Sequence, residues 1–172
     1  LGPKGEVVQA GMLQRNDAHK LIEECMIAAN VEAAKFVIDA DVPSPFRIHE
    51  RPPEQKYADL QEFLKEFGLR MPAWAQVEPR DFTQLLKKIR ERADAALLES
   101  VLLRSQSLAV YATGNVGHFG LALEAYAHFT SPIRRYPDLL LHRAIKHALS
   151  GARPEKFKYS PSEMAQLALQ SS

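Results

Sequence analysis

The amino-acid sequence predicts a helix-rich α+β fold with about six helices and a few strands. Most of the chain consists of segments whose apolar residues recur at helical spacing, separated by prolines and glycines. Stretches typical of strands are short and fall within residues 5–13 and 105–123. With 172 residues, 46% of them hydrophobic and 25% charged, the chain is long enough to bury one sizeable core.

The helical part of the chain, residues 16–107, follows a predicted strand remnant at 5–13. Asn16 can cap the first helix, and Gly68 can end the second. Prolines between these two helices leave 46–49 as a short extended piece. The four expected helices are 16–39, 53–67, 80–92 and 94–107. The apolar stripe of the first helix, which predicts packing on a core, comprises Ala18, Leu21, Ile22, Cys25, Met26, Ala29, Ala33, Phe36 and Val37.

The last part of the chain is predicted to combine buried strands with two helices. Residues 105–123 contain no Asp, Glu, Lys or Arg, and within them 110–111 and 119–123 are typical of buried strands around a glycine-rich turn. These strands belong to a core segment, 108–151, that carries the sequence SPIRRY. Helices are expected over 137–150 and 160–170.

Composition restricts the class of protein. No apolar run approaches the roughly 18 to 20 residues that span a bilayer, and the first residues lack a secretory pattern. The single cysteine, Cys25, excludes an internal disulfide framework and a thiolate-rich zinc site. We therefore expect a cytoplasmic protein without a membrane partner.

The net charge of +1 is unevenly distributed. Residues 1–99 carry 14 Lys/Arg against 17 Asp/Glu, whereas residues 100–172 carry 8 against 4. A polyanionic partner would therefore bind the last third of the chain, although a chance fluctuation in composition is the simpler explanation of the charge alone.

The densest polar cluster lies at residues 128–138. Ser131 and Pro132 form a helix-start pair, but Pro137 cannot sit comfortably inside the helix that they would begin. We expect a short turn at 131–136 that leads into a second helix start at Pro137.

This cluster contains two adjacent arginines, Arg134 and Arg135. Arginines between two helix starts can bind phosphate, because guanidinium groups and free backbone N–H groups then point the same way. Alternatively, one arginine only pairs with Asp138 at helical spacing. Asp138 could also be a metal ligand, but a lone carboxylate beside two arginines is more typical of a group that orients an arginine.

Other candidate residues are weaker on residue pattern alone. Glu23 and Asn30 lie at the edge of the apolar stripe of the first helix, where they could hydrogen-bond a ribose or a base, or form an ordinary solvated margin. His142 and His147 are five residues apart and cannot share a metal ion as an i, i+4 pair would. The glycines match no phosphate-binding loop, and the aspartates are scattered.

Two blocks of sequence resemble the catalytic domain of the ribonuclease II family, the RNB domain. The first is RNDAHKLIEECMIAAN at 15–30, and the second is HFGLALEAYAHFTSPIRRYPDLLLHR at 118–143. Two long blocks in the family's order are far more specific than one short motif. The resemblance covers essentially the whole chain and is weakest over 52–93.

The resemblance implies a processive 3′→5′ exoribonuclease that hydrolyses single-stranded RNA to nucleoside 5′-monophosphates, with Mg²⁺ assisting the attack of water. Arg134 matches the arginine of the family's SPxR motif and would contact the scissile phosphate as the catalytic residue. Glu23 and Glu24 fall in the block that lines the RNA channel. The remaining substrate-binding candidates are Asn30, His128, Arg135 and Tyr136.

The family's aspartate-rich metal motif has no counterpart in this sequence. The resemblance therefore implies that residues 1–172 are the C-terminal portion of a catalytic domain, whose Mg²⁺ ligands, cold-shock domains and S1 domain belong to a longer polypeptide. Leu1 in place of Met agrees with that expectation. We expect the segment alone to be inactive and to self-associate through unpaired strand edges and exposed apolar faces. The alternatives are a non-catalytic RNA-binding or interaction module on the same scaffold, and a structural helical domain that binds a protein.

Overall fold

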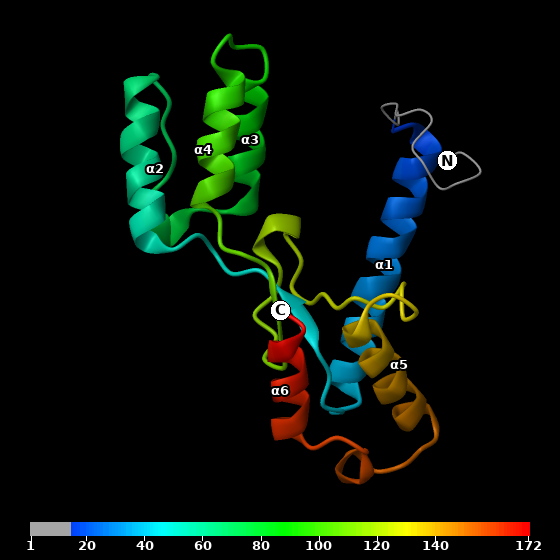
Figure 1. Ribbon diagram of the computed structural model, residues 1–172. Helices are drawn as coiled ribbons and strands as arrows, with labels where there is room; N and C mark the ends of the chain where they lie inside the picture. Colours follow the sequence, from blue (N-terminus) through cyan, green and yellow to red (C-terminus); the bar gives the residue numbers. More distant parts are fainter. Residues whose placement is uncertain (1–14) are drawn as a thin grey trace, which may run out of the picture.

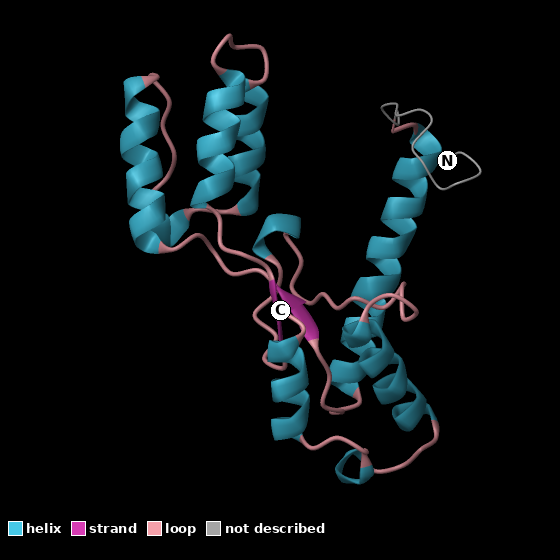
Figure 2. Cartoon of the chain, viewed as in Figure 1, coloured by secondary structure: helices cyan, strands magenta, loops and turns pink. Residues whose placement is uncertain are grey.

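The computed structural model of the protein describes residues 15–172, which form six α-helices and a two-stranded sheet (Figure 1). The helices separate into two groups that meet near the sheet, as Figure 2 shows. Within the described residues, the predicted helix-rich α+β class is confirmed. The strand expected at 5–13 lies outside them. None of the described helices is long and apolar enough to cross a membrane.

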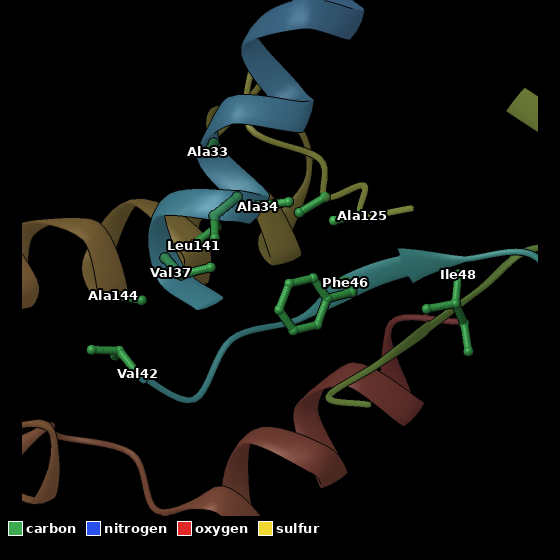
Figure 3. Close-up of a cluster of buried hydrophobic side chains, with 10 residues drawn as sticks. Ala33, Ala34, Val37, Val42, Phe46, Ile48, Ala125, Leu141 and Ala144 are labelled. Atoms are coloured by element: carbon green, nitrogen blue, oxygen red, sulfur yellow. The ribbon is translucent and has the colours of Figure 1, made fainter. Parts of the chain in front are cut away.

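The first group packs helices α1 (Asp17–Asp39) and α5 (Tyr136–Leu149) against strand β1 (Phe46–Ile48). Small side chains at the crossing allow the two helices to approach closely. Figure 3 shows Leu141 and Ala144 beside the C-terminal half of α1, with Phe46 closing the cluster from the strand. The buried members of this core are Ala33, Ala34, Val37, Val42, Phe46, Ile48, Ala125, Ala127, Leu141 and Ala144.

The second group is a three-helix lobe formed by α2 (Glu54–Glu66), α3 (Pro79–Ile89) and α4 (Ala95–Ser105). It has a core of its own, in which Tyr57 is fully buried and donates its hydroxyl hydrogen to the Pro72 carbonyl oxygen at 2.9 Å. The lobe thus has a buried core of its own, and the first group forms the site described below.

The sheet joins β1 to β2 (Val110–Ala112) in antiparallel register, with Arg47 opposite Tyr111. The segment that contains Tyr126 lies beside β1, where the Arg47 N–H donates to the Tyr126 carbonyl oxygen at 2.9 Å. The other strand is covered by the end of α6 (Pro161–Gln170), where Ser172 Oγ accepts from the Tyr111 N–H at 2.7 Å. These contacts satisfy backbone groups that a two-stranded sheet would otherwise expose.

Two expectations about elements were wrong. Residues 119–123 do not form a strand: Phe119–Leu121 is a 3₁₀ turn, and Ala122 adopts a left-handed conformation with φ of 56°. The reason is a tight return of the chain, in which the His118 N–H donates to the Leu123 carbonyl oxygen at 2.8 Å.

The second difference concerns the apolar stripe of α1. Ala33 and Val37 are buried, whereas Leu21 and Ile22 are 64% and 59% exposed. Only the C-terminal half of α1 meets α5 and β1, and the N-terminal half extends away from them (Figure 1).

Candidate functional site

The turn before α5 is held by a buried carboxylate. The Arg134 and Arg135 N–H groups both donate to the Ser131 carbonyl oxygen, at 3.2 and 3.1 Å. Asp138 is fully buried in the first turn of α5, and its Oδ2 accepts from the Ser131 N–H at 2.8 Å. The turn followed by a second helix start near Pro137 is therefore confirmed, with α5 beginning at Tyr136.

Asp138 also orients one of the two arginines. Arg135 donates through Nε to Oδ1 at 2.9 Å and through Nη2 to Oδ2 at 2.8 Å. This two-point ion pair has the geometry that makes arginine–carboxylate bonds strong and directional. The pairing considered for one arginine in the sequence thus occurs, and Arg135 is the residue that it holds.

Arg134 has the opposite environment. Its side chain is exposed and makes no hydrogen bond or ion pair with any residue in the range 15–172. It lines a cavity of about 480 Å³ together with Tyr111, Tyr136 and the end of α6. The lining residues include no carboxylate, so this cavity is cationic and open to an anion.

The turn differs from the expected cradle of free N–H groups. The N–H groups of Ser131, Arg134 and Arg135 are already bonded within the protein. The binding capacity of the cavity therefore depends on the guanidinium of Arg134 more than on backbone dipoles.

A polar network ties the segment before this turn to α1 and β2. Asn30 is buried, and its Nδ2 donates to the Tyr126 hydroxyl at 3.0 Å while its Oδ1 accepts from the Phe129 N–H at 2.9 Å. Two residues from Tyr126, His128 Nδ1 lies 2.7 Å from the Tyr111 hydroxyl. Both ends of the Asn30 amide thus bind protein groups, which gives this residue a positioning role.

Burial and neighbouring charges keep the histidines of this region neutral. Burial, followed by the positive charge of Arg135, lowers the pKa of His128 to about 4. Burial, followed by nearby His49, lowers the pKa of His118 to about 4 as well. His128 is therefore an uncharged hydrogen-bonding partner of Tyr111 at neutral pH.

The structure brings most, but not all, of the sequence-predicted site residues together. Arg134, Arg135 and Tyr136 belong to the turn and the start of α5, and His128 and Asn30 support the segment that leads into it. The two glutamates are separate from this group. Glu23 and Glu24 are exposed on the N-terminal half of α1, where Glu23 pairs with Arg15.

Two tyrosines of this region were not among the predicted site residues. Tyr111 lies in β2 with the Arg47 guanidinium 4.7 Å above its ring, and it lines the Arg134 cavity. Tyr126 accepts the Asn30 hydrogen bond. The available signal was the spacing of Tyr126 and His128, because side chains two apart in an extended segment share a face.

Residues 15–172 do not bring three or more His, Cys, Asp or Glu side chains close enough to hold a metal ion. Asp138 is occupied by Arg135 and Ser131. The described residues therefore do not fit the ligand set of a catalytic Mg²⁺ ion.

These features define a class of protein: a helix-rich α+β domain in which a fixed turn presents an exposed arginine to a cavity. Such an arginine can bind a phosphate ester through two parallel hydrogen bonds. The comparison with known families is specific, because the RNB domain model matches residues 2–151. The chain belongs to the RNB domain family.

Relatives and solved structures agree with this assignment. Ribonuclease R of Escherichia coli (strain K12) is 51% identical over 162 residues, which are 90% of this chain and 20% of that protein. The apo form of Mycoplasma genitalium RNase R has a TM-score of 0.81 at 27% identity, over 91% of this chain and 25% of that one. The same protein in complex with ribose methylated single-stranded RNA has a TM-score of 0.79 at 25% identity, over 92% and 26%.

The chain thus spans about a fifth of the length of its curated relative. Within the family, the resemblance of the two sequence blocks is to bacterial ribonuclease R, and the named relatives confirm it.

Proposed function

We propose that this chain is part of an exoribonuclease that hydrolyses single-stranded RNA from its 3′ end to nucleoside 5′-monophosphates. The observation that carries the proposal is Arg134, whose guanidinium has no partner within residues 15–172, lines a cavity without carboxylates and stands at the arginine of the SPxR motif. Membership of the RNB family and the likeness to an RNA-bound ribonuclease R support it.

Arg134 contacts the scissile phosphate in this proposal. Its charge stabilises the phosphoryl oxygens more strongly as negative charge develops on them, which lowers the barrier more than it strengthens RNA binding. Arg135 acts through Asp138 and keeps the turn in place, so it is a positioning residue. Tyr136, which is 45% exposed at the cavity, is proposed to contact the RNA.

The supporting residues act at longer range. Neutral His128 and buried Asn30 hold the segment from 126 to 129 in position behind the turn. Glu23 and Glu24 lie on the N-terminal half of α1, which projects away from α5. We propose that they face RNA in a channel completed by other parts of a longer, cytoplasmic polypeptide.

Mg²⁺ is proposed as the cofactor of that longer polypeptide. A bound divalent cation can lower the pKa of water and polarise a phosphoryl oxygen. Because residues 15–172 offer no suitable cluster of ligands, we assign none of them to the ion. The ligands would come from outside this chain, as would the cold-shock and S1 domains.

The test is the Arg134→Ala substitution in the full-length protein. We expect kcat on a single-stranded oligonucleotide to fall by about 10²- to 10³-fold, the effect of removing one transition-state donor. The Kd for the same RNA, measured without cleavage in EDTA, should change by less than about threefold. Arg135→Lys, which keeps the positive charge, should lower kcat far less than Arg134→Ala does.

Equal losses of affinity and turnover would show instead that Arg134 is a tether for RNA. A full-length wild-type protein that binds RNA but releases no mononucleotides with Mg²⁺ would favour the non-catalytic RNA-binding module.

A further inference from the structure

A second group of cations lies at the opposite end of α5 from the Arg134 turn. Arg143, Lys146 and His147 of α5 form one wall of a cavity of about 420 Å³, and residues 156–159 of the following loop form the other. This basic pocket, defined by Arg143, Lys146, His147 and 156–159, is separate from the cavity that contains Arg134.

The positive charges of the basic pocket are not paired with carboxylates of the described residues. Arg143, Lys146, Lys156 and Lys158 form no ion pair with a carboxylate in the part of the chain that the structure describes. Lys158 also lines a neighbouring cavity with Asp41, Glu155 and Glu163, and all three carboxylates lie outside the lining of the basic pocket. Holding four like charges around one cavity costs free energy, which an external anion would offset.

Contacts with aromatic side chains hold three residues of the basic pocket: Arg143, Lys158 and His147. The Tyr159 hydroxyl accepts a hydrogen bond from Arg143 Nη1, and Lys158 Nζ lies 5.5 Å from the centre of the Tyr159 ring. On the other side, His147 packs 5.0 Å from the ring of Phe157 and bonds the Arg153 carbonyl oxygen at 2.9 Å. The loop is thus attached to α5 before any ligand binds, which reduces the entropy cost of binding.

A helix C-terminus attracts cations by itself, and this accounts for Lys146 and His147 in the last turn of α5. It does not account for Lys156 and Lys158, which lie outside the helix in the facing loop. A cavity with cations on both walls is therefore more than a favourable helix end.

We propose that the basic pocket binds a backbone phosphate of RNA, as a second phosphate site outside the Arg134 cavity. The proposal rests on RNA being the substrate of the protein. Along α5, Tyr136 at the Arg134 cavity and Lys146 at the basic pocket are ten residues apart, about 15 Å at 1.5 Å per residue. A stacked strand that occupies both sites therefore extends over about four to five nucleotides at 3.4 Å each.

The experiment compares two double variants of the full-length protein. Lys156→Ala/Lys158→Ala removes two charges from the basic pocket, and Lys65→Ala/Lys87→Ala removes two exposed charges from the three-helix lobe. The probes are single-stranded oligonucleotides of 3 and 25 nucleotides, and their Kd is measured in EDTA over a range of salt concentrations.

The pocket variant should bind the longer strand about 5- to 10-fold more weakly at 0.1 M salt. The magnitude of the slope of log K against log salt should fall by about 0.7, the contribution of one neutralised phosphate of a single strand. For the pocket variant, the Kd and kcat on the short strand should be unchanged. For the control variant, the Kd for each strand and the kcat on the short strand should be unchanged.

Equal weakening by both variants, or no change in the salt slope of the pocket variant, would overturn the proposal. Failure of the Arg134→Ala test would instead show up in turnover on the short strand, so the two proposals fail in distinguishable ways.

Discussion

The two adjacent arginines, Arg134 and Arg135, have opposite environments. Arg135 is 26% exposed and held at two points by fully buried Asp138, whereas Arg134 is exposed and free of protein partners within residues 15–172. The first arginine contributes to the shape of the turn, and the second is available to a ligand. The local residue pattern presents them as equivalent neighbours, and only the family resemblance distinguishes Arg134.

Asp138→Asn should be strongly destabilising. The substitution weakens a buried ion pair and leaves the Arg135 charge without its partner, which typically costs about 3 kcal/mol of unfolding free energy. Urea unfolding followed by circular dichroism measures the loss.

The control for this variant is Asp94→Asn. Asp94 pairs with Arg92 through the same two-point geometry but is 29% exposed, whereas Asp138 is fully buried, so the loss at Asp94 should be smaller. Similar losses for the two variants would show that burial does not strengthen the Asp138 pair.

The lowered pKa values of His118 and His128 predict a pH-dependent stability. Both pKa values are about 4 in the folded protein and 6.5 in an ordinary environment, so unfolding takes up as many as two protons between these limits. The two neutral imidazoles therefore make their full contribution to the free energy of unfolding above pH 6.5, and this contribution is lost as the pH falls toward 4.

The measurement is the free energy of unfolding at pH 7, 6 and 5. His128→Gln should flatten this dependence, because one of the two groups no longer titrates. An unfolding free energy that stays constant from pH 7 to 5 in the wild-type protein would contradict the prediction.

At the scale of elements, the return of the chain at 117–123 replaces the strand expected there. Gly117 has a φ of +80°, and a Cβ on it would lie 2.8 Å from the Leu123 carbonyl oxygen. Both backbone conformation and space therefore require glycine at this position.

Gly117→Ala should accordingly destabilise the protein at least twice as much as Gly68→Ala. At Gly68, with a φ of +71°, a Cβ meets no atom within 4 Å, so the cost is the backbone strain of about 1 kcal/mol alone. Thermal unfolding of the two variants tests this, and equal shifts in Tm would mean that the close approach to Leu123 relaxes freely.

At the scale of the whole molecule, two cores divide the described residues between the three-helix lobe and the α1–α5 group. The candidate site belongs entirely to the second group. Exposed Leu21 and Ile22 on α1 extend the apolar surface of that group beyond its own contacts.

The purified 172-residue chain is predicted to have no more than trace nuclease activity with Mg²⁺. The described residues include no cluster of metal-binding side chains, so they provide no means to hold the ion near Arg134. Release of mononucleotides from a labelled single strand, followed by thin-layer chromatography, is the measurement. Robust release by a preparation free of other nucleases would contradict the prediction.

The exposed Leu21 and Ile22 of α1 lead us to expect self-association of this chain. Sedimentation at increasing protein concentration should show a rising average mass, and Leu21→Ser/Ile22→Ser should reduce it. A constant monomer mass for the wild-type chain would exclude association through this face.

Much of the fold and the central arginine could be predicted from sequence, because they depend on local signals. Helix periodicity, the caps at Asn16 and Ser160 and the two prolines around the SPIRRY turn act within a few residues of each other. The same local order made the two family blocks recognisable.

Contacts between distant segments could not be predicted in this way, because they depend on packing. Asn30 binds groups 96 and 99 residues away, Tyr111 meets His128 across the sheet, and the basic pocket joins α5 to a loop that follows it. Periodicity does not reveal which side of a segment another will cover. The residue pattern was therefore enough to show which side chains could bind phosphate, whereas packing leaves Arg134 exposed for this role and holds Arg135 on Asp138.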